Sequence, residues 1–374
     1  MANTVFVRGG AHSASVEEVW GEKTYRQAER DSFFNDGRFV GTDSNSIIQV
    51  NSDLTKNKGD QIHTPLRARL IDDGKINDEA IEGSEKALTF YNCDTTIHKR
   101  KQAVRLDGEM TERRTKIKLR GEAKEALGAW HADTRDTDIV LGLSGLANAL
   151  NTFPVSAPTS ARRFYGGQNV SGAVGVVSVA DDGLITGTDG AHRFGTQVLS
   201  HLKRMAQIDG GSSYGKIRPV IIKGKKYFVF FASPWQVKAL KMEDRWINAQ
   251  KDANVRGEDN PLFSGACGIW DGIIVHEYDK IQLRTGAATQ NTAAERFEST
   301  DYVPNGVTVA RGLFCGAQAG ILAYGRKIGW KEKMFEYESQ FGVEVSSIYG
   351  FSKAKFNSQD FAVITCDTAV DLDA

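Results

Sequence analysis

The chain has 374 residues, of which 47 are basic and 47 are acidic, so its formal net charge is zero. This balance gives no overall attraction to nucleic acid or to a membrane surface. The N-terminal sequence lacks the apolar segment of a signal peptide, and no apolar run could span a bilayer, so we expect a soluble protein with two or three folding units. The widely spaced cysteines are expected to be reduced and buried: Cys93, Cys267, Cys315 and Cys366.

Residues 1–50 have weak periodicity and many polar side chains, which predicts an extended arm with one short helix within 15–34. Three aromatic residues near its end, Phe33, Phe34 and Phe39, need a surface to cover them. That surface belongs either to the body of the same chain or to another chain.

The next region predicts a long two-stranded excursion with a polar tip, because candidate strands at 62–70 and 87–99 flank a polar segment. The segment is strongly acidic, with Lys75 and Lys86 as its basic residues. Its carboxylates are Asp72, Asp73, Asp78, Glu79, Glu82 and Glu85.

A basic stretch at 99–124 follows and leads into the clearest helix of the sequence, predicted over 109–132 from an apolar stripe at helical spacing. No aromatic residues are interleaved with its basic residues, as stacking on nucleic-acid bases would require. A solvated helix face and pairing with the acidic segment of another copy both remain open. The candidate residues for that pairing, besides the six carboxylates, are Arg113, Arg114, Lys116, Lys118 and Arg120.

Further along, residues 150–215 are rich in Gly, Ser and Asn and have uncertain boundaries. Two strands around Lys223–Lys225 precede a helix over 234–250, for which Ser233 is the N-cap and Gln236 the capping-box partner. Residues 268–283 have a strand pattern, and 330–370 have strands and turns. The four-residue spacing of Gly312, Gly316 and Gly320 predicts a helix packed closely against a sheet.

Two motifs resemble catalytic or metal sites. Gly211–Gly215 has the Gly-x-Ser-x-Gly pattern around Ser213, but a helical pattern precedes it and a strand follows, the reverse of a hydrolase elbow. His276 and Glu277 begin a His-Glu-x-x-His pattern, but Lys280 stands where the second ligand is needed, and neighbouring strand residues point to opposite faces. We therefore predict no catalytic, cofactor-binding or metal-binding residue.

The stretch 257–278 is better interpreted as part of the fold. Cys267 and Trp270 are expected in the core, residues 272–275 in a buried strand, and Asp271 and His276 at strand ends.

Five segments in order give the sequence its resemblance to a known family. They are LDGEMTERRTKIKLR, the helix at 234–250, GEDNPLFSGACGIWDGIIV, VARGLFCGAQAG and GFSKAKFNSQDFAVI. From Trp20 to Val370 the chain resembles the major capsid proteins of tailed phages, in the N-4-like podophage family with its Hong Kong 97-type fold.

The resemblance implies an α+β fold with an arm, an extended loop, a spine helix, and peripheral and axial domains. The implied divisions are 1–50 for the N-terminal arm, 51–108 for the extended E-loop β-hairpin, 109–150 for the spine helix of the peripheral domain, 151–310 mainly for the axial domain, and 311–374 for the return strands of the peripheral domain.

The resemblance also implies a structural protein of the virion, without enzymatic activity or cofactor. Such a protein self-assembles in the host bacterial cytoplasm into hexamers and pentamers of an icosahedral head around double-stranded DNA. Its partners would be its own copies, scaffold, portal and decoration proteins, and DNA bound non-specifically at the inner face, with no membrane.

Two alternatives remain at this point: an encapsulin-like host compartment with the same architecture, and a serine hydrolase using Ser213 and His276. Covalent cross-linking through Lys75 or Lys86 is a further property that the sequence leaves open.

Overall fold

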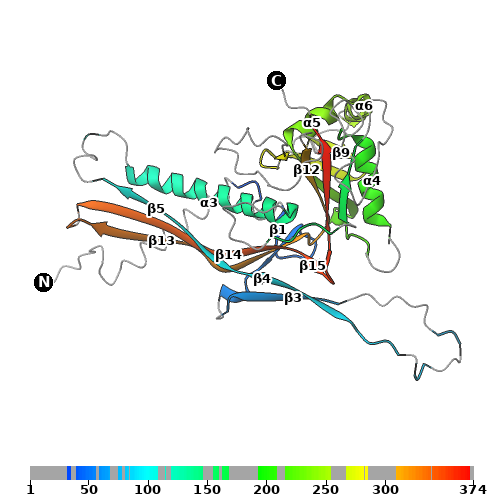
Figure 1. Ribbon diagram of the computed structural model, residues 1–374, viewed down its shortest axis with the longest axis horizontal. Helices are drawn as coiled ribbons and strands as arrows, with labels where there is room; N and C mark the ends of the chain where they lie inside the picture. The colour runs from blue at the N-terminus through cyan, green and yellow to red at the C-terminus, as the bar shows by residue number, and fades with distance from the viewer. Residues whose placement is uncertain are drawn as a thin grey trace.

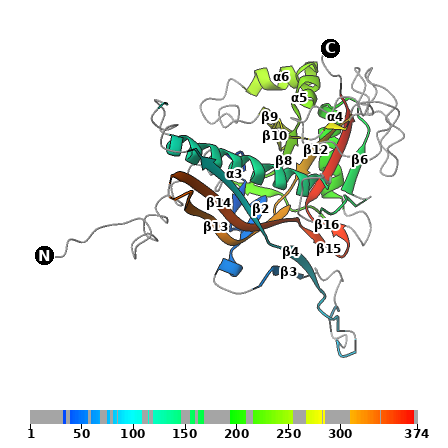
Figure 2. The ribbon, with the colours of Figure 1, turned by 60° about the vertical axis from the view of Figure 1, so that its left-hand side comes forward.

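Two large β-sheets and one long helix form the framework of the described chain (Figures 1 and 2). The computed structural model describes residues 32–34, 39–55, 59–67, 75–77, 81–83, 85–107, 114, 119–145, 155–159, 162–167, 193–208, 215–253, 267–281, 283–284, 309–337 and 339–370. The predicted short helix within 15–34 lies almost entirely outside these residues. Within them, no helix is both long enough and apolar enough to cross a membrane.

The first sheet has five strands among the described residues, in the order β1-β2-β13-β14-β5. They are β1 (Val40–Gly41), β2 (Ile48–Asn51), β13 (Gly320–Phe335), β14 (Gln340–Lys353) and β5 (His98–Leu106). The long pair β13–β14 is antiparallel from Gly320–Lys353 to Phe335–Gln340, with an irregularity around Arg326. A short 3-10 helix, η1 (Asp53–Thr55), follows β2.

One long helix, α3 (Leu119–Ser144), packs along this sheet against β14 and β5 (Figure 1). It ends twelve residues beyond the predicted end at 132, because its apolar face continues through the buried residues Ile139 and Leu143. The helix ends at Gly145, whose φ of 70° suits glycine and whose N–H donates to the Leu141 carbonyl at 3.0 Å.

The second sheet has eight strands among the described residues, and its main path is β6-β17-β12-β8-β10-β9. These are β6 (Arg163–Tyr165), β17 (Val363–Ala369), β12 (Val309–Cys315), β8 (Lys225–Ala232), β10 (Ile273–Glu277) and β9 (Gly268–Trp270). β11 (Leu283–Arg284) pairs with β12, and β7 (Val220–Ile222) pairs with β8. Three helices gather around this sheet: α4 (Thr196–Gln207), α5 (Pro234–Lys241) and α6 (Asp244–Ala253) (Figure 1).

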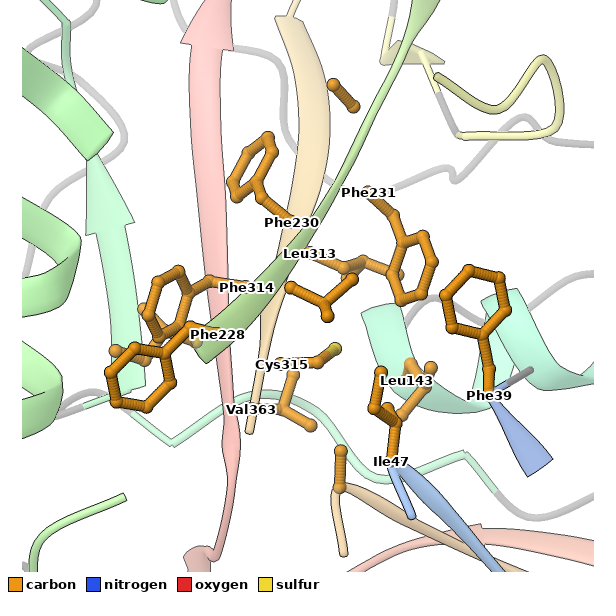
Figure 3. Packing of buried hydrophobic residues seen from close by; sticks show 14 of the residues in the cluster. Phe39, Ile47, Leu143, Phe228, Phe230, Phe231, Leu313, Phe314, Cys315 and Val363 are labelled. Atoms are coloured by element: carbon orange, nitrogen blue, oxygen red, sulfur yellow. The ribbon is translucent and has the colours of Figure 1, made fainter. Parts of the chain in front are cut away.

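The core is continuous on both faces of β8 (Figure 3). Phe230 stacks on Phe194, which precedes α4, with ring centroids 4.8 Å apart. Phe231 points to the other side, where it meets Phe39 at 5.2 Å. Because successive side chains of β8 point to opposite faces, the strand packs against α4 and α5 on one face and against α3 and the N-terminal segment on the other.

The predicted helix around Gly312, Gly316 and Gly320 is wrong, because this stretch forms the end of β12, a turn and the start of β13. The glycines do mark close packing. A Cβ on Gly312 would lie 2.3 Å from Phe230 Cζ, and one on Gly316 would lie 2.5 Å from the Arg218 carbonyl oxygen. These glycines are therefore required where other parts of the chain approach the backbone closely, and their spacing does not mark one face of a helix.

The predicted helix over 234–250 is two helices, with a break at Met242 and Glu243. The predicted capping box at Ser233 and Gln236 is confirmed. The break lets the Glu243 carboxylate accept hydrogen bonds from the backbone N–H (2.8 Å) and hydroxyl (2.5 Å) of Thr196, the first residue of α4. Since the N-cap residue of α4, Gly195, offers no side chain, α4 takes its cap from Glu243, which lies between α5 and α6.

Two short ribbons complete the described strands. β3 (Gln61–Arg67) pairs antiparallel with β4 (Phe90–Thr96), which confirms the predicted excursion. β15 (Lys355–Phe356) pairs with β16 (Gln359–Asp360). The strand after β4 already belongs to the five-stranded sheet, and the segment 311–374 contributes strands to both large sheets.

Candidate assembly surfaces

The β3–β4 ribbon projects from the body of the molecule (Figures 1 and 2). Four apolar residues along it and its tip are exposed: Ile76 (67%), Ile81 (64%), Leu88 (54%) and Phe90 (60%). An isolated two-stranded ribbon is marginal in water, and exposed apolar groups on it indicate a surface that another molecule covers. The sequence pattern predicted the excursion but not the contact surface formed by these apolar residues. Their position within a strongly acidic segment was the signal for it.

Four of the eleven residues predicted to pair charges between copies lie within the described chain. Glu82 and Glu85 are exposed near the ribbon tip, where the Glu85 carboxylate accepts a hydrogen bond from the Gly83 N–H at 2.8 Å. Arg114 is helical and exposed. The residues outside the described chain are Asp72, Asp73, Asp78, Glu79, Arg113, Lys116 and Lys118.

The fourth residue, Arg120, is engaged within its own chain. Its guanidinium forms an ion pair with Glu332 on β13 and lies 4.8 Å from the centroid of the Phe341 ring. Glu332 also accepts a hydrogen bond from the Trp330 indole N–H at 2.8 Å. Arg120 therefore fixes the start of α3 on the sheet.

Polar residues fix the middle of α3 on the same sheet. His131 contacts the Ser347 hydroxyl at 2.8 Å, and Asp138 accepts hydrogen bonds from Arg100 and from the Tyr349 hydroxyl, each at 2.7 Å. Burial raises the pKa of Asp138 to about 6, although Arg100 and Tyr349 oppose this shift. Burial and the nearby guanidinium groups lower the pKa of His131 to about 3, so this imidazole is neutral.

The segment from Ser32 to Phe34 is held by a polar clamp formed by Ser32, Arg135 and Asp136. Asp136 accepts hydrogen bonds from the Ser32 hydroxyl at 2.5 Å and the Phe33 N–H at 2.7 Å. Arg135 donates to the Ser32 hydroxyl at 2.7 Å and to the Phe34 carbonyl at 3.1 Å. The three clamp residues are buried, so this contact is part of the core.

The aromatic residues beside the clamp pack on the body of the same chain, which decides between the two surfaces proposed for them. Phe33 stacks on Tyr278 with ring centroids 4.3 Å apart, and Phe34 meets Phe231 edge-on at 5.3 Å. Phe39 lies 5.0 Å from the His276 ring.

The residues that resemble a catalytic or metal site are dispersed. His276 is buried within β10, not at its end as predicted, while Glu277 beside it is exposed, 3.7 Å from Lys241. Asp271, with a φ of 48°, lies in the β9–β10 turn and pairs with Lys203 at 2.6 Å. No group of three potential metal ligands occurs in the described chain, and Ser213 lies outside it.

The cysteines include no disulfide among the described residues. Cys93, Cys315 and Cys366 are buried, as predicted, whereas Cys267 is half-buried. Burial raises the pKa of the Cys267 thiol, and the nearby Glu277 carboxylate adds to this effect. A thiol with a raised pKa is a poor nucleophile.

Comparisons with known proteins agree with this architecture. A family model described as "Phage capsid protein" matches residues 15–372. The major capsid protein of Pseudomonas phage KPP25 is 29% identical over 374 residues, covering 92% of this chain and 93% of that protein. The capsid of Ralstonia phage GP4 is 26% identical, with a TM-score of 0.74 and coverage of 90% of this chain and 91% of that chain. The capsid of cyanophage Pam1 is 24% identical, with a TM-score of 0.71 and coverage of 90% and 92%.

These likenesses confirm the predicted Hong Kong 97-type fold, with its long helix, extended ribbon and two sheets. Because the family model spans nearly the whole sequence, the chain belongs to the phage capsid protein family.

Proposed function

We propose that this chain is the shell-forming major capsid protein of a phage, and that it self-assembles into hexamers and pentamers of an icosahedral head around double-stranded DNA. The observation that carries the proposal is the projecting β3–β4 ribbon with its exposed apolar residues, in a chain that matches the capsid family from 15 to 372. Large interfaces built from many weak contacts suffice for this function.

The divisions inferred from the sequence give each part a role in assembly. Residues 1–50 are the N-terminal arm, 51–108 the extended loop, 109–150 the spine helix, 151–310 mainly the axial domain, and 311–374 the return strands. Support comes from α3 along the five-stranded sheet and from the helices α4 to α6 around the eight-stranded sheet. Assembly takes place in the host cytoplasm, with scaffold, portal and decoration proteins as further partners.

Charge pairing between copies is part of the proposal. The acidic residues of 72–85 on one copy meet the basic residues that precede α3 in the sequence of the next, namely Arg113, Arg114, Lys116 and Lys118. Arg120, the remaining predicted partner, already pairs with Glu332 in its own chain. Reversing the charge of Arg113, Arg114 and Lys116 should reduce assembly while the circular dichroism spectrum of the unassembled subunit is unchanged.

Negative-stain electron microscopy of the purified chain tests the proposal directly. We expect closed, round shells of uniform size at high protein concentration. A protein that stays monomeric with and without co-expressed head proteins of its phage would refute the proposal.

A further inference from the structure

We propose that the tip of the β7–β8 hairpin binds the phosphate backbone of the enclosed double-stranded DNA. This inference rests on the proposed function and names the surface of the subunit that contacts the duplex. We call residues 221–226 the hairpin tip. It consists of the end of β7, the turn at Lys223 and Gly224, and the start of β8.

The hairpin tip lies in a part of the sequence that has no carboxylate. Between Asp209 and Glu243 there is no Asp or Glu, although the whole chain has 47 of them. The same stretch contains the basic residues Lys216, Arg218, Lys223, Lys225, Lys226, Lys238 and Lys241. In a chain of zero net charge, such a local excess of positive charge indicates an anionic partner wherever the fold exposes it.

The fold exposes this charge at the hairpin tip. All six residues from Ile221 to Lys226 are exposed. The antiparallel register pairs Ile221 with Lys226 and Ile222 with Lys225, and successive pairs point to opposite faces of the ribbon. Since both pairs are exposed, neither face of the tip is covered by the body of the subunit.

The tip has a defined conformation before any partner binds. The side chain of Asn45 donates to the Ile221 carbonyl and accepts from the Ile221 N–H, each at 2.8 Å, which fixes the outer edge of β7. The turn has φ values of 49° at Lys223 and 78° at Gly224, as tight two-residue hairpin turns require. Such turns favour Asn, Asp or Gly at the first position, so the turn itself does not explain why a lysine is there.

The carboxylates beside the tip leave most of its charge uncompensated. Asp271, in the β9–β10 turn, already pairs with Lys203 of α4 at 2.6 Å. Asp43 is an acceptor for the Ser44 hydroxyl at 3.5 Å, and Ser44 in turn accepts from Arg218 at 3.5 Å. Within the described chain, no ion pair is formed by Lys216, Lys225 or Lys226.

The residue types at the tip favour duplex phosphates over bases. Lysine ammonium groups are compact point charges, and duplex DNA carries about one negative charge per 1.7 Å of its axis. The tip has no aromatic residue on which the bases of a single strand could stack. A two-stranded ribbon fits the major groove of a duplex, where the exposed Ile221 (47%) and Ile222 (42%) become covered. The contact is non-specific, because phosphates carry no sequence information.

Removal of charge from the tip, with matched controls, tests this contact on unassembled subunits. The tip variant carries Lys223→Gln, Lys225→Gln and Lys226→Gln. The charge-retaining variant carries Lys223→Arg, Lys225→Arg and Lys226→Arg. A control removes the same charge from three exposed lysines of the other sheet, by Lys99→Gln, Lys101→Gln and Lys331→Gln.

The dissociation constant of a fluorescent 30-base-pair duplex is measured by anisotropy between about 50 and 200 mM salt. A fluorescent poly-glutamate peptide is the second probe, circular dichroism reports folding, and sedimentation reports shell yield. We expect the tip variant to bind the duplex about tenfold or more weakly at the lowest salt, and its logarithmic salt dependence to be shallower by about three, one for each lost phosphate contact. The charge-retaining variant and the control should keep the salt dependence of the unaltered subunit.

Equal salt dependence for the tip variant and the unaltered subunit, or no duplex binding by the unaltered subunit, would overturn the inference. Loss of poly-glutamate binding with unchanged duplex binding would overturn it in favour of an acidic protein partner. Loss of shell yield with unchanged duplex binding would overturn it in favour of a contact between copies. Failure of the unaltered chain to form shells would refute the proposed function, a result distinct from these because duplex binding is measured on single subunits.

Discussion

A buried ion pair between neighbouring strands should be the most sensitive point of the subunit to a change of one charge. Arg311 on β12 and Asp367 on β17 form two hydrogen bonds of 2.7 and 2.8 Å, and their side chains are 2% and 0% exposed. Arg311 also donates to the carbonyl of Ser144, the last residue of α3, at 3.2 Å. The proposed change is Asp367→Asn, which keeps the size of the side chain and removes its charge.

The expected cost follows from leaving the guanidinium buried without its counter-charge. Removing one partner of a buried pair costs about 3–5 kcal/mol, because the remaining ion stays buried away from water without the charge that compensated it. Arg163 is a secondary partner of Asp367 at 3.6 Å, but its side chain is 24% exposed, so water can solvate it. The loss in the free energy of unfolding therefore arises mainly from the buried guanidinium of Arg311.

The assay is urea unfolding of unassembled subunits, monitored by circular dichroism, for the unaltered chain and each variant. Replacing both residues, Arg311→Met with Asp367→Leu, should be far less destabilising than Asp367→Asn alone, because no buried charge is left over. The reasoning would be refuted if Asp367→Asn cost less than about 1 kcal/mol, or if the double variant were the least stable of the set.

Three further predictions concern packing and pH. Gly350→Ala should destabilise the subunit by about 1–3 kcal/mol or more, because its Cβ would lie 2.0 Å from the Thr96 carbonyl oxygen. Gly121→Ala, within α3 and with open space around its Cβ, should instead stabilise it by up to about 1 kcal/mol. Asp138 has a folded pKa of about 6 against an ordinary 3.8. The free energy of unfolding gained from protonated Asp138 is fully present below pH 3.8 and is lost as the pH rises through about 6. This is a change of about 3 kcal/mol, which Asp138→Asn should abolish.

Urea midpoints measure all three predictions, with the two alanine variants as controls for each other. Equal midpoints for Gly350→Ala and the unaltered chain would contradict the packing argument, and a lower midpoint for Gly121→Ala would contradict the helix argument. For Asp138, parallel pH profiles of the Asn variant and the unaltered subunit would show that this carboxyl does not titrate as described.

Local signals predicted the elements whose pattern is confined to neighbouring residues. The capping box at Ser233, the β7–β8 turn and the two strands of the ribbon depend on residues close in sequence, and all three are confirmed. The family resemblance added the long-range order that no local pattern contains. It placed the arm, ribbon and long helix in one architecture.

The failures came where a distant residue decides the structure. Gly312 is explained by Phe230, from a strand some eighty residues earlier, so its spacing to other glycines carries no helical information. The break in the helix over 234–250 is explained by Thr196, whose backbone needs the Glu243 carboxylate.

The clamp of Ser32 by Arg135 and Asp136 also has a mechanical consequence. It ties the segment at Ser32 and Phe33 both to α3, through Asp136 and Arg135, and to Tyr278, which stacks on Phe33. The helix α3 packs on the five-stranded sheet, whereas the Tyr278 N–H donates to the Ala232 carbonyl of β8 in the eight-stranded sheet. A force applied at Ser32 is therefore shared by both sheets.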